Sequence, residues 1–152
     1  MKQMKKLSAV PVSESSKVYR AVKAWLDTYE DKPAARIDFE YLPEDGGLMF
    51  SIMQGALKTK QYILGGYMAQ CQFQIMYRVI CETNDDRMKA DEVLNSYGEW
   101  CEENTATLEL PAPSGMQIKR KKCVRSAESA TLDRQGDVEI HVIPLILTYE
   151  VI

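Results

Sequence analysis

Apolar residues recur along this chain at two different spacings, and the spacing predicts which segments are helices and which are strands. Two stretches carry apolar residues three or four positions apart, as amphipathic helices do. The first follows the capping residues 13–16 and ends before Pro33, and the second follows the capping residues 83–85. The two apolar stripes are Val18, Val22, Trp25, Leu26 and Tyr29, and then Met88, Ala90, Val93, Leu94, Tyr97, Trp100 and Cys101.

Period-two alternation predicts strands in the first half of the chain. Two short alternating runs flank the turn-like residues 43–47, so we expect a β-hairpin over residues 36–53. Residues 55–66 are expected to be a connector with a short strand near 60–64. The clearest alternation covers residues 67–81, far beyond the usual strand length of about 5–6 residues. A strand of this length usually bends, or projects beyond its domain to contact something else.

The second half of the chain predicts further strands. Residues 116–125 form a basic strand, and residues 126–137 are polar and close on a turn. Residues 138–152 form a last strand that is apolar on both faces near its end, so we expect it to be central or covered on both sides. Pro144 cannot donate to a ladder, which implies a bulge or an edge position there.

These elements predict an α+β fold: a mostly antiparallel sheet with two amphipathic helices packed on one face. The length of 152 residues suits one domain. We expect that domain to cover residues 13–152, after a flexible basic arm of residues 1–12. Residues 8–13 are too short and too polar for the apolar part of a signal peptide. No apolar run reaches the roughly 20 residues that a membrane span needs, so we expect a cytoplasmic protein without membrane contact.

The residue types that usually carry chemistry are few and scattered. Cys71, Cys81, Cys101 and Cys123 are never closer than ten positions, so we expect free thiols and no metal or cofactor site. His141 is the only histidine, and we expect it to be a strand residue without a catalytic role. Cys123 has cationic neighbours and is the thiol whose reactivity is most worth testing. The acidic residues of the second helix are expected to face solvent.

One basic cluster is a candidate interaction surface. Its members are Lys119, Arg120, Lys121, Lys122 and Arg125. In a strand these charges fall on both faces, so we expect neither face to be buried. The favoured interpretation is an edge strand guarded by lysines, the next is contact with an acidic partner, and DNA contact is the weakest. The net charge of −3 and the lack of stacking aromatic residues in the cluster disfavour DNA.

Several segments together resemble a family of small prophage proteins of Gram-positive bacteria, the tail terminator or head–tail joining proteins often called minor capsid proteins. The shared features are the pair Trp25 and Leu26 in a helix, the turn at residues 42–46, and the Gln-rich strand at residues 70–78. Trp100 near the end of the second helix and the closing strand with residues 147–149 are also similar. The resemblance covers roughly residues 17–152, but the basic cluster matches no feature of the family.

The resemblance implies a tail-terminator-like fold and a virion component assembled in the host bacterial cytoplasm. It implies a subunit without catalytic activity that closes into a homo-oligomeric ring, most often of six copies, by shape and edge pairing. That ring would contact the tail tube and the neck or connector proteins. The alternative is a small cytoplasmic enzyme or ligand-binding domain with a pocket between sheet and helices, using Cys123 or His141. A third reading is a DNA-contacting head completion protein.

Overall fold

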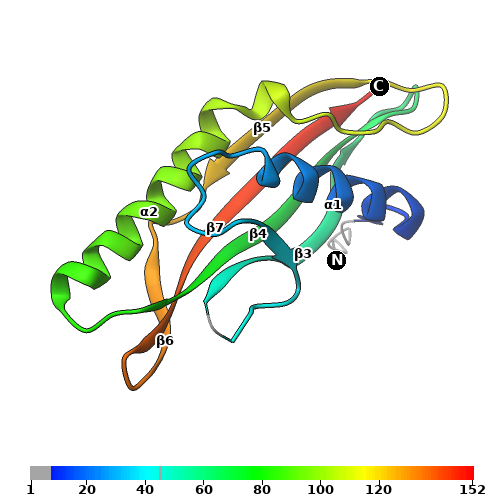
Figure 1. Ribbon diagram of the computed structural model, residues 1–152. Helices are drawn as coiled ribbons and strands as arrows, with labels where there is room; N and C mark the ends of the chain where they lie inside the picture. The colour runs from blue at the N-terminus through cyan, green and yellow to red at the C-terminus, as the bar shows by residue number, and fades with distance from the viewer. Residues whose placement is uncertain (1–7, 45) are drawn as a thin grey trace, which may run out of the picture.

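The computed structural model describes residues 8–44 and 46–152, which form one sheet covered on one face by two helices (Figure 1). The strand order is β1-β3-β4-β7-β5, with β2 also paired to β3 and β6 to β7. The elements are β1 (Ser8–Ala9), α1 (Val12–Asp27), β2 (Ile37–Phe39), β3 (Gly47–Gln61), β4 (Tyr67–Ile80), α2 (Asn84–Glu103), the 3-10 helix η1 (Thr105–Thr107), β5 (Ile118–Arg125), β6 (Ala130–Gln135) and β7 (Val138–Val151). The expected α+β architecture is confirmed. Neither described helix is long and apolar enough to span a bilayer.

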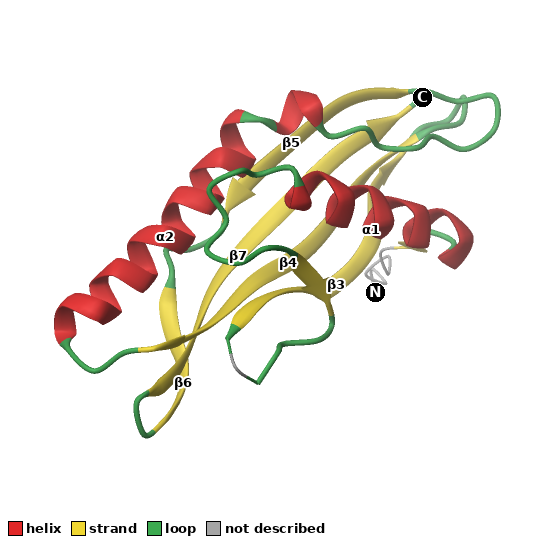
Figure 2. Ribbon diagram, in the orientation of Figure 1, coloured by secondary structure: helices red, strands yellow, loops and turns green. Residues whose placement is uncertain are grey.

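The core lies between the sheet and the helices, which cross the same face (Figure 2). The long alternating strand is confirmed as β4, which buries its odd positions from Tyr67 to Ile75 on the helix side. Aromatic contacts join the two helices, because the ring centroids of Trp25 and Trp100 lie 5.0 Å apart and those of Tyr29 and Tyr97 lie 4.6 Å apart. The apolar residues predicted to face the core from the second helix are buried or half-buried in α2, except Met88, which is exposed.

The two helices begin differently. Thr83 caps α2 as predicted: its hydroxyl accepts from the backbone of Asp86, whose carboxylate accepts from the backbone of Thr83. The predicted serine cap of α1 is wrong, because α1 starts at Val12 with Pro11 at the cap position and no side-chain cap. The fixed φ of proline, −52° here, lets Pro11 lead directly into the first turn.

The boundary of the N-terminal arm also needs correction. Residues 1–7 of the expected arm lie outside the described residues. Residues 8–12 belong to the fold, since β1 pairs with Lys58 and Leu57 of β3 and Val10 is buried. The backbone amide of Val10 donates to Ala56.

The predicted hairpin over residues 36–53 is wrong in direction. Strand β2 pairs with β3 in parallel, with Ile37 opposite Leu48 and Phe39 opposite Phe50. Alternation correctly placed Ile37, Leu48 and Phe50 in the core, whereas Phe39 is exposed. A period of two does not encode strand direction. Glu40 takes a left-handed φ of 53° just after β2, which is uncommon for a residue with a side chain and turns the chain away from a direct return.

The predicted connector over residues 55–66 is instead largely the second half of β3, which runs to Gln61. Register shifts against β4 occur between Ile52 and Gln54, between Gln54 and Leu57, and between Lys58 and Lys60. Each bulge moves the following side chains to the other face, so the alternation of β3 is lost in the sequence. The true turn of the β3–β4 hairpin is residues 62–66.

Strand β7 is central, as predicted, between β4 on one side and β5 with β6 on the other. Pro144 stays in register with Gln74 of β4. On its other side, β5 pairs only as far as Leu145 and β6 begins at Val142, so Pro144 lies where the two partner strands are interrupted. The expected irregularity is therefore in the partner strands and not in β7 itself.

The outer edge of β3 is closed by neighbouring groups. Strands β2 and β1 pair with its two halves. Between them, a Glu40 carboxylate oxygen accepts from the Ile52 amide at 2.8 Å, and the Tyr19 hydroxyl accepts from the Ala56 amide at 2.9 Å. The opposite side of the sheet ends in β5 and β6, whose outer edges pair with no described strand. The two edges of the sheet are therefore unequal.

We expect Gly66→Ala to destabilise the β3–β4 turn much more than Gly65→Ala. Both glycines have positive φ, 92° for Gly65 and 89° for Gly66, so both variants carry a similar conformational cost. A Cβ on Gly65 meets nothing within 4 Å, whereas one on Gly66 collides with the backbone carbonyl of Val151. Urea unfolding should show an extra loss of about 1–3 kcal/mol for Gly66→Ala. Equal losses in the two variants would contradict this packing.

Candidate functional site

The predicted basic surface lies on edge strand β5, which confirms the edge position. Its charges divide between the two faces of the sheet. Lys121 and Arg125 lie on the helix side, in register with Tyr149 and Leu145, whereas Arg120 and Lys122 lie on the face without helices. A register shift separates Ile118 from Arg120.

Most of these cations already have partners. Arg120 pairs with Glu150 at 3.2 Å and lowers the pKa of that carboxyl, to which the Tyr62 hydroxyl also donates. Arg125 pairs with Glu102 of α2 at 2.8 Å. The Lys121 ammonium donates to a backbone carbonyl of the segment before β5. Cations paired in this way still protect the edge from pairing with another strand. They are less able to bind nucleic-acid phosphates, because carboxylates already neutralise part of their charge.

Cys123 shares the helix side of β5 with Lys121 and Arg125. Its side chain is buried on the helix side of β5, which corrects the expectation that neither face of this strand is buried. Its nearest thiol neighbour is Cys101 of α2, whose pKa is raised because burial disfavours the thiolate. All four cysteines are free and buried, as expected from their spacing. A thiol in this position is shielded from reagents.

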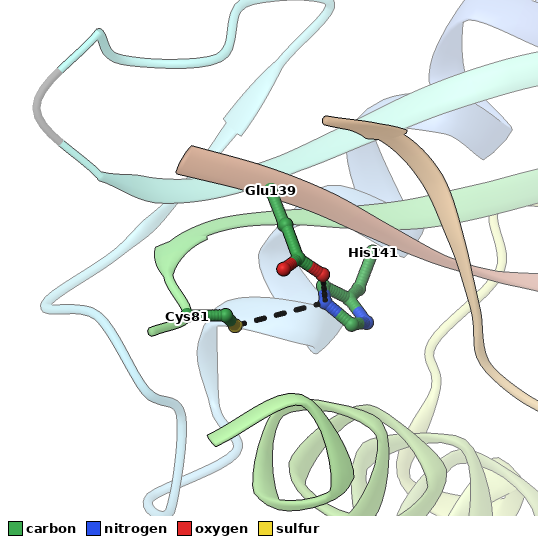
Figure 3. Close-up of side chains that lie close together, drawn as sticks. All are labelled: Cys81, Glu139 and His141. Atoms are coloured by element: carbon green, nitrogen blue, oxygen red, sulfur yellow. Dashed lines mark hydrogen bonds and ion pairs between the residues drawn. The ribbon is translucent and has the colours of Figure 1, made fainter. Parts of the chain in front are cut away.

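The polar groups that the fold brings together lie elsewhere, in a buried cluster that we call the polar cluster: Cys81, Glu139 and His141 (Figure 3). Cys81 follows the end of β4, while Glu139 and His141 are two positions apart near the start of β7. His141 Nε2 lies 3.2 Å from Glu139 Oε1 and 3.9 Å from Cys81 Sγ. All three side chains are at most 1% exposed.

Helix α2 and the β5–β6 connection complete the surroundings of the polar cluster. His141 Nδ1 lies 2.8 Å from Asp91 Oδ1, and the Ser129 hydroxyl donates to the same oxygen at 2.9 Å. Arg87 donates through Nε to Glu139 Oε2 at 2.6 Å. The cluster therefore connects β4, β7 and α2 with the connection after β5.

The order Cys81, His141, Asp91 matches the order of a nucleophile, base and orienting carboxylate. Two observations disfavour that chemistry. Burial, followed by the charges of Glu139 and Asp86, raises the pKa of the Cys81 thiol and so disfavours the thiolate. The near-complete burial of Cys81 and His141 also leaves a substrate no approach. The surface hollows along the described residues are lined by other side chains.

Sequence reasoning placed His141 on the apolar face correctly but missed its partners. Asp91 is one of the acidic residues of the second helix that were expected to face solvent, but its carboxylate contacts the buried His141. One signal was present in the sequence: Glu139 and His141 are in phase with Ile143, Leu145 and Leu147, so both had to be buried. Two buried polar side chains on one apolar face require partners.

The opposite face of the sheet carries a different candidate surface, which we call the open face. No described helix covers it (Figure 1). Met49, Met76 and Val142 lie in one row across β3, β4 and β7, and their side chains are half-buried only by their neighbours in the sheet. At the end of the β3–β4 hairpin, Ile63 and Leu64 are completely exposed. Exposed apolar groups of this kind mark contact sites.

Comparison with known proteins assigns no family to this chain. No protein-family model matches the sequence. No curated protein matches it either.

Proposed function

We propose that the chain is a structural subunit of a bacteriophage particle, a tail terminator or head–tail joining protein that assembles into a ring at the neck end of the tail. The observation that carries the proposal is the open face, an extended apolar and amide-rich sheet surface that no described element covers. The resemblance at residues 42–46 and in the Gln-rich part of β4 supports the same role. The ring is proposed to hold six copies and to contact the tail tube and connector proteins.

A ring requires two different, complementary surfaces on each subunit. Edge pairing alone does not supply them, because the outer edge of β3 is occupied between Leu48 and Lys58 by β1, β2 and side chains. The open face and the exposed hairpin tip with Ile63 and Leu64 are two distinct apolar surfaces. We infer that these two surfaces, and not two sheet edges, form the contact between copies.

The competing function is a small enzyme or ligand-binding domain. The Cys81, His141 and Asp91 arrangement is the observation that favours it. Its burial favours the structural role instead. DNA contact through β5 is not part of the proposal, because Arg120 and Arg125 are paired with carboxylates.

Light scattering behind a sizing column tests the proposal. We expect the wild-type mass to correspond to a closed oligomer, six copies above all, over a range of concentrations. Met76→Lys on the open face and Leu64→Lys at the hairpin tip should each shift the mass to that of a monomer, since a buried lysine without a partner is costly. Met88→Lys places the same charge on an exposed methionine of α2 and should leave the mass unchanged.

A wild-type monomer at every concentration would contradict a ring that the chain forms by itself. Loss of the oligomer in Met88→Lys as well would contradict the assignment of the contact to the open face. Electron microscopy of the oligomer should show a closed ring, and open filaments would contradict closure.

A further inference from the structure

The polar cluster contains three atoms of the kinds that bind transition metals, converging on one point. Cys81 Sγ, Glu139 Oε1 and His141 Nε2 all lie within 4.8 Å of one another. Zinc bonds to such atoms are about 2.0–2.3 Å long, so in a tetrahedral site the ligand atoms lie about 3.3–3.7 Å apart. The separations of 3.2 Å and 3.9 Å from Nε2 bracket this range, and for these two pairs side-chain adjustments of a few tenths of an ångström would reach it. The sulfur and the carboxylate lie within 4.8 Å of each other and would approach further on binding an ion.

The partners of the cluster orient it as the outer groups of metal sites do. Asp91 faces Nδ1 at 2.8 Å, which favours the tautomer in which Nδ1–H donates and Nε2 presents its lone pair to the cluster. Arg87 donates to Oε2 of Glu139. The other carboxylate oxygen, Oε1, is turned toward His141 (Figure 3). The Ser129 hydroxyl in turn donates a hydrogen bond to the Asp91 carboxylate and fixes its position. The ligand atoms are therefore held by second partners that do not compete for the same lone pairs.

With the proton on Nδ1, the Nε2 atom of His141 and the Oε1 atom of Glu139 are both hydrogen-bond acceptors, and they face each other. In that tautomer, the lone pair of Nε2 points toward a carboxylate oxygen 3.2 Å away, which is repulsive unless a cation lies between them. A metal ion uses all three atoms, and the Cys81 sulfur has no side-chain partner other than His141 among the described residues.

We propose that Cys81, Glu139 and His141 bind a zinc ion, although the sequence spacing led us to expect no metal site. The mixed sulfur, nitrogen and oxygen set suits Zn²⁺, whereas Mg²⁺ and Ca²⁺ prefer oxygen ligands throughout. The thiolate and the carboxylate balance the two charges of the ion, and Arg87 and Asp91 balance each other. A water molecule completes the fourth position.

The role of this site is structural. The three ligands are buried, so a substrate cannot reach the ion. Ion binding fastens the end of β4 to the start of β7, and through Asp91 and Arg87 it also holds the first half of α2. This inference does not depend on the proposed function.

The experiment titrates Zn²⁺ into the chelator-treated full-length protein, with calorimetry and a chromophoric zinc chelator as competitor. We expect one ion per chain and a rise of the thermal midpoint by several degrees. The Co²⁺ complex should show a thiolate-to-cobalt charge-transfer band in the near ultraviolet. Cys81→Ser should abolish that band, and Asp91→Asn should weaken zinc affinity by about 10–100-fold.

Cys123→Ser is the matched control, because Cys123 is also buried but lies beside Cys101 and not in the polar cluster. It should keep stoichiometry, affinity and the cobalt band. Lack of zinc binding by the wild-type protein, or a cobalt complex without the thiolate band, would overturn the proposal even if a variant failed to fold. Loss of binding in Cys123→Ser with retention in Cys81→Ser would overturn it in favour of the Cys101–Cys123 pair.

Discussion

Phe73→Ala should lower the free energy of unfolding by about 3–5 kcal/mol, the range for removing a large aromatic side chain from a packed core. Phe73 lies in the middle of β4 with no exposed surface, between Ile52 and Leu145 of the neighbouring strands. Its ring makes an edge contact with Phe50 at a centroid distance of 5.3 Å. Because β4 has a central place in the sheet, the surrounding residues cannot collapse easily into the cavity.

Urea unfolding at one fixed protein concentration measures this loss. Gln70→Ala is the control, because it shortens a side chain on the open face of the same strand and should change stability by no more than about 0.5 kcal/mol. An effect of similar size in both variants would mean that the two faces of β4 are buried alike, against the arrangement described here.

Arg87→Met should cost about 2–4 kcal/mol in metal-free buffer. The substitution leaves Glu139 as a buried carboxylate without its closest cation, whose Nε lies 2.6 Å from Oε2. Removal of one partner from a fully buried ion pair costs about 3–5 kcal/mol. The expected value is lower because the Arg87 side chain is 25% exposed and Arg134 lies 3.8 Å from the same oxygen.

The double variant Arg87→Met with Glu139→Gln separates the cost of leaving the Glu139 carboxylate unpaired from the other effects of replacing Arg87. It removes the unpaired charge, so part of the stability should return in the urea unfolding curve. If the double variant were less stable than the sum of the single variants predicts, the ion pair would not be the reason for the loss.

The sequence predicted the structure best for β4, which pairs with β7 in one unbroken register. Strand β4 runs from Tyr67 to Ile80 without a break in its pairing to β7, so its alternation could be followed residue by residue. Strand β3 is almost as long, but its three register shifts against β4 erase the alternation, and we expected a connector there. The direction of β2 was also missed, because the pattern of Ile37 and Phe39 is the same in a parallel and an antiparallel pair.

The polar cluster shows a different limit on what can be predicted from the sequence. Cys81, Asp91 and His141 come from three separate elements, and only the strand register and the position of α2 bring them together. Glu139 and His141 are in phase with buried apolar residues, which is a signal of burial that the sequence contains, but the sequence does not identify their partners. For the basic cluster the sequence predicted the edge position but not the ion pairs, because the carboxylates that pair with Arg120 and Arg125 are distant in sequence.

The unequal edges of the sheet also limit how far these molecules could polymerise by strand pairing. Two copies joined through their β5 edges would form one continuous sheet, and both of its ends would then be β3 edges. Between Leu48 and Lys58 those ends are already occupied by β1, β2, Glu40 and Tyr19, so pairing with a further copy is disfavoured there. Continued edge-to-edge growth of the amyloid kind is therefore disfavoured on the β3 side, and the described edges that remain open to another copy are those of β5 and β6.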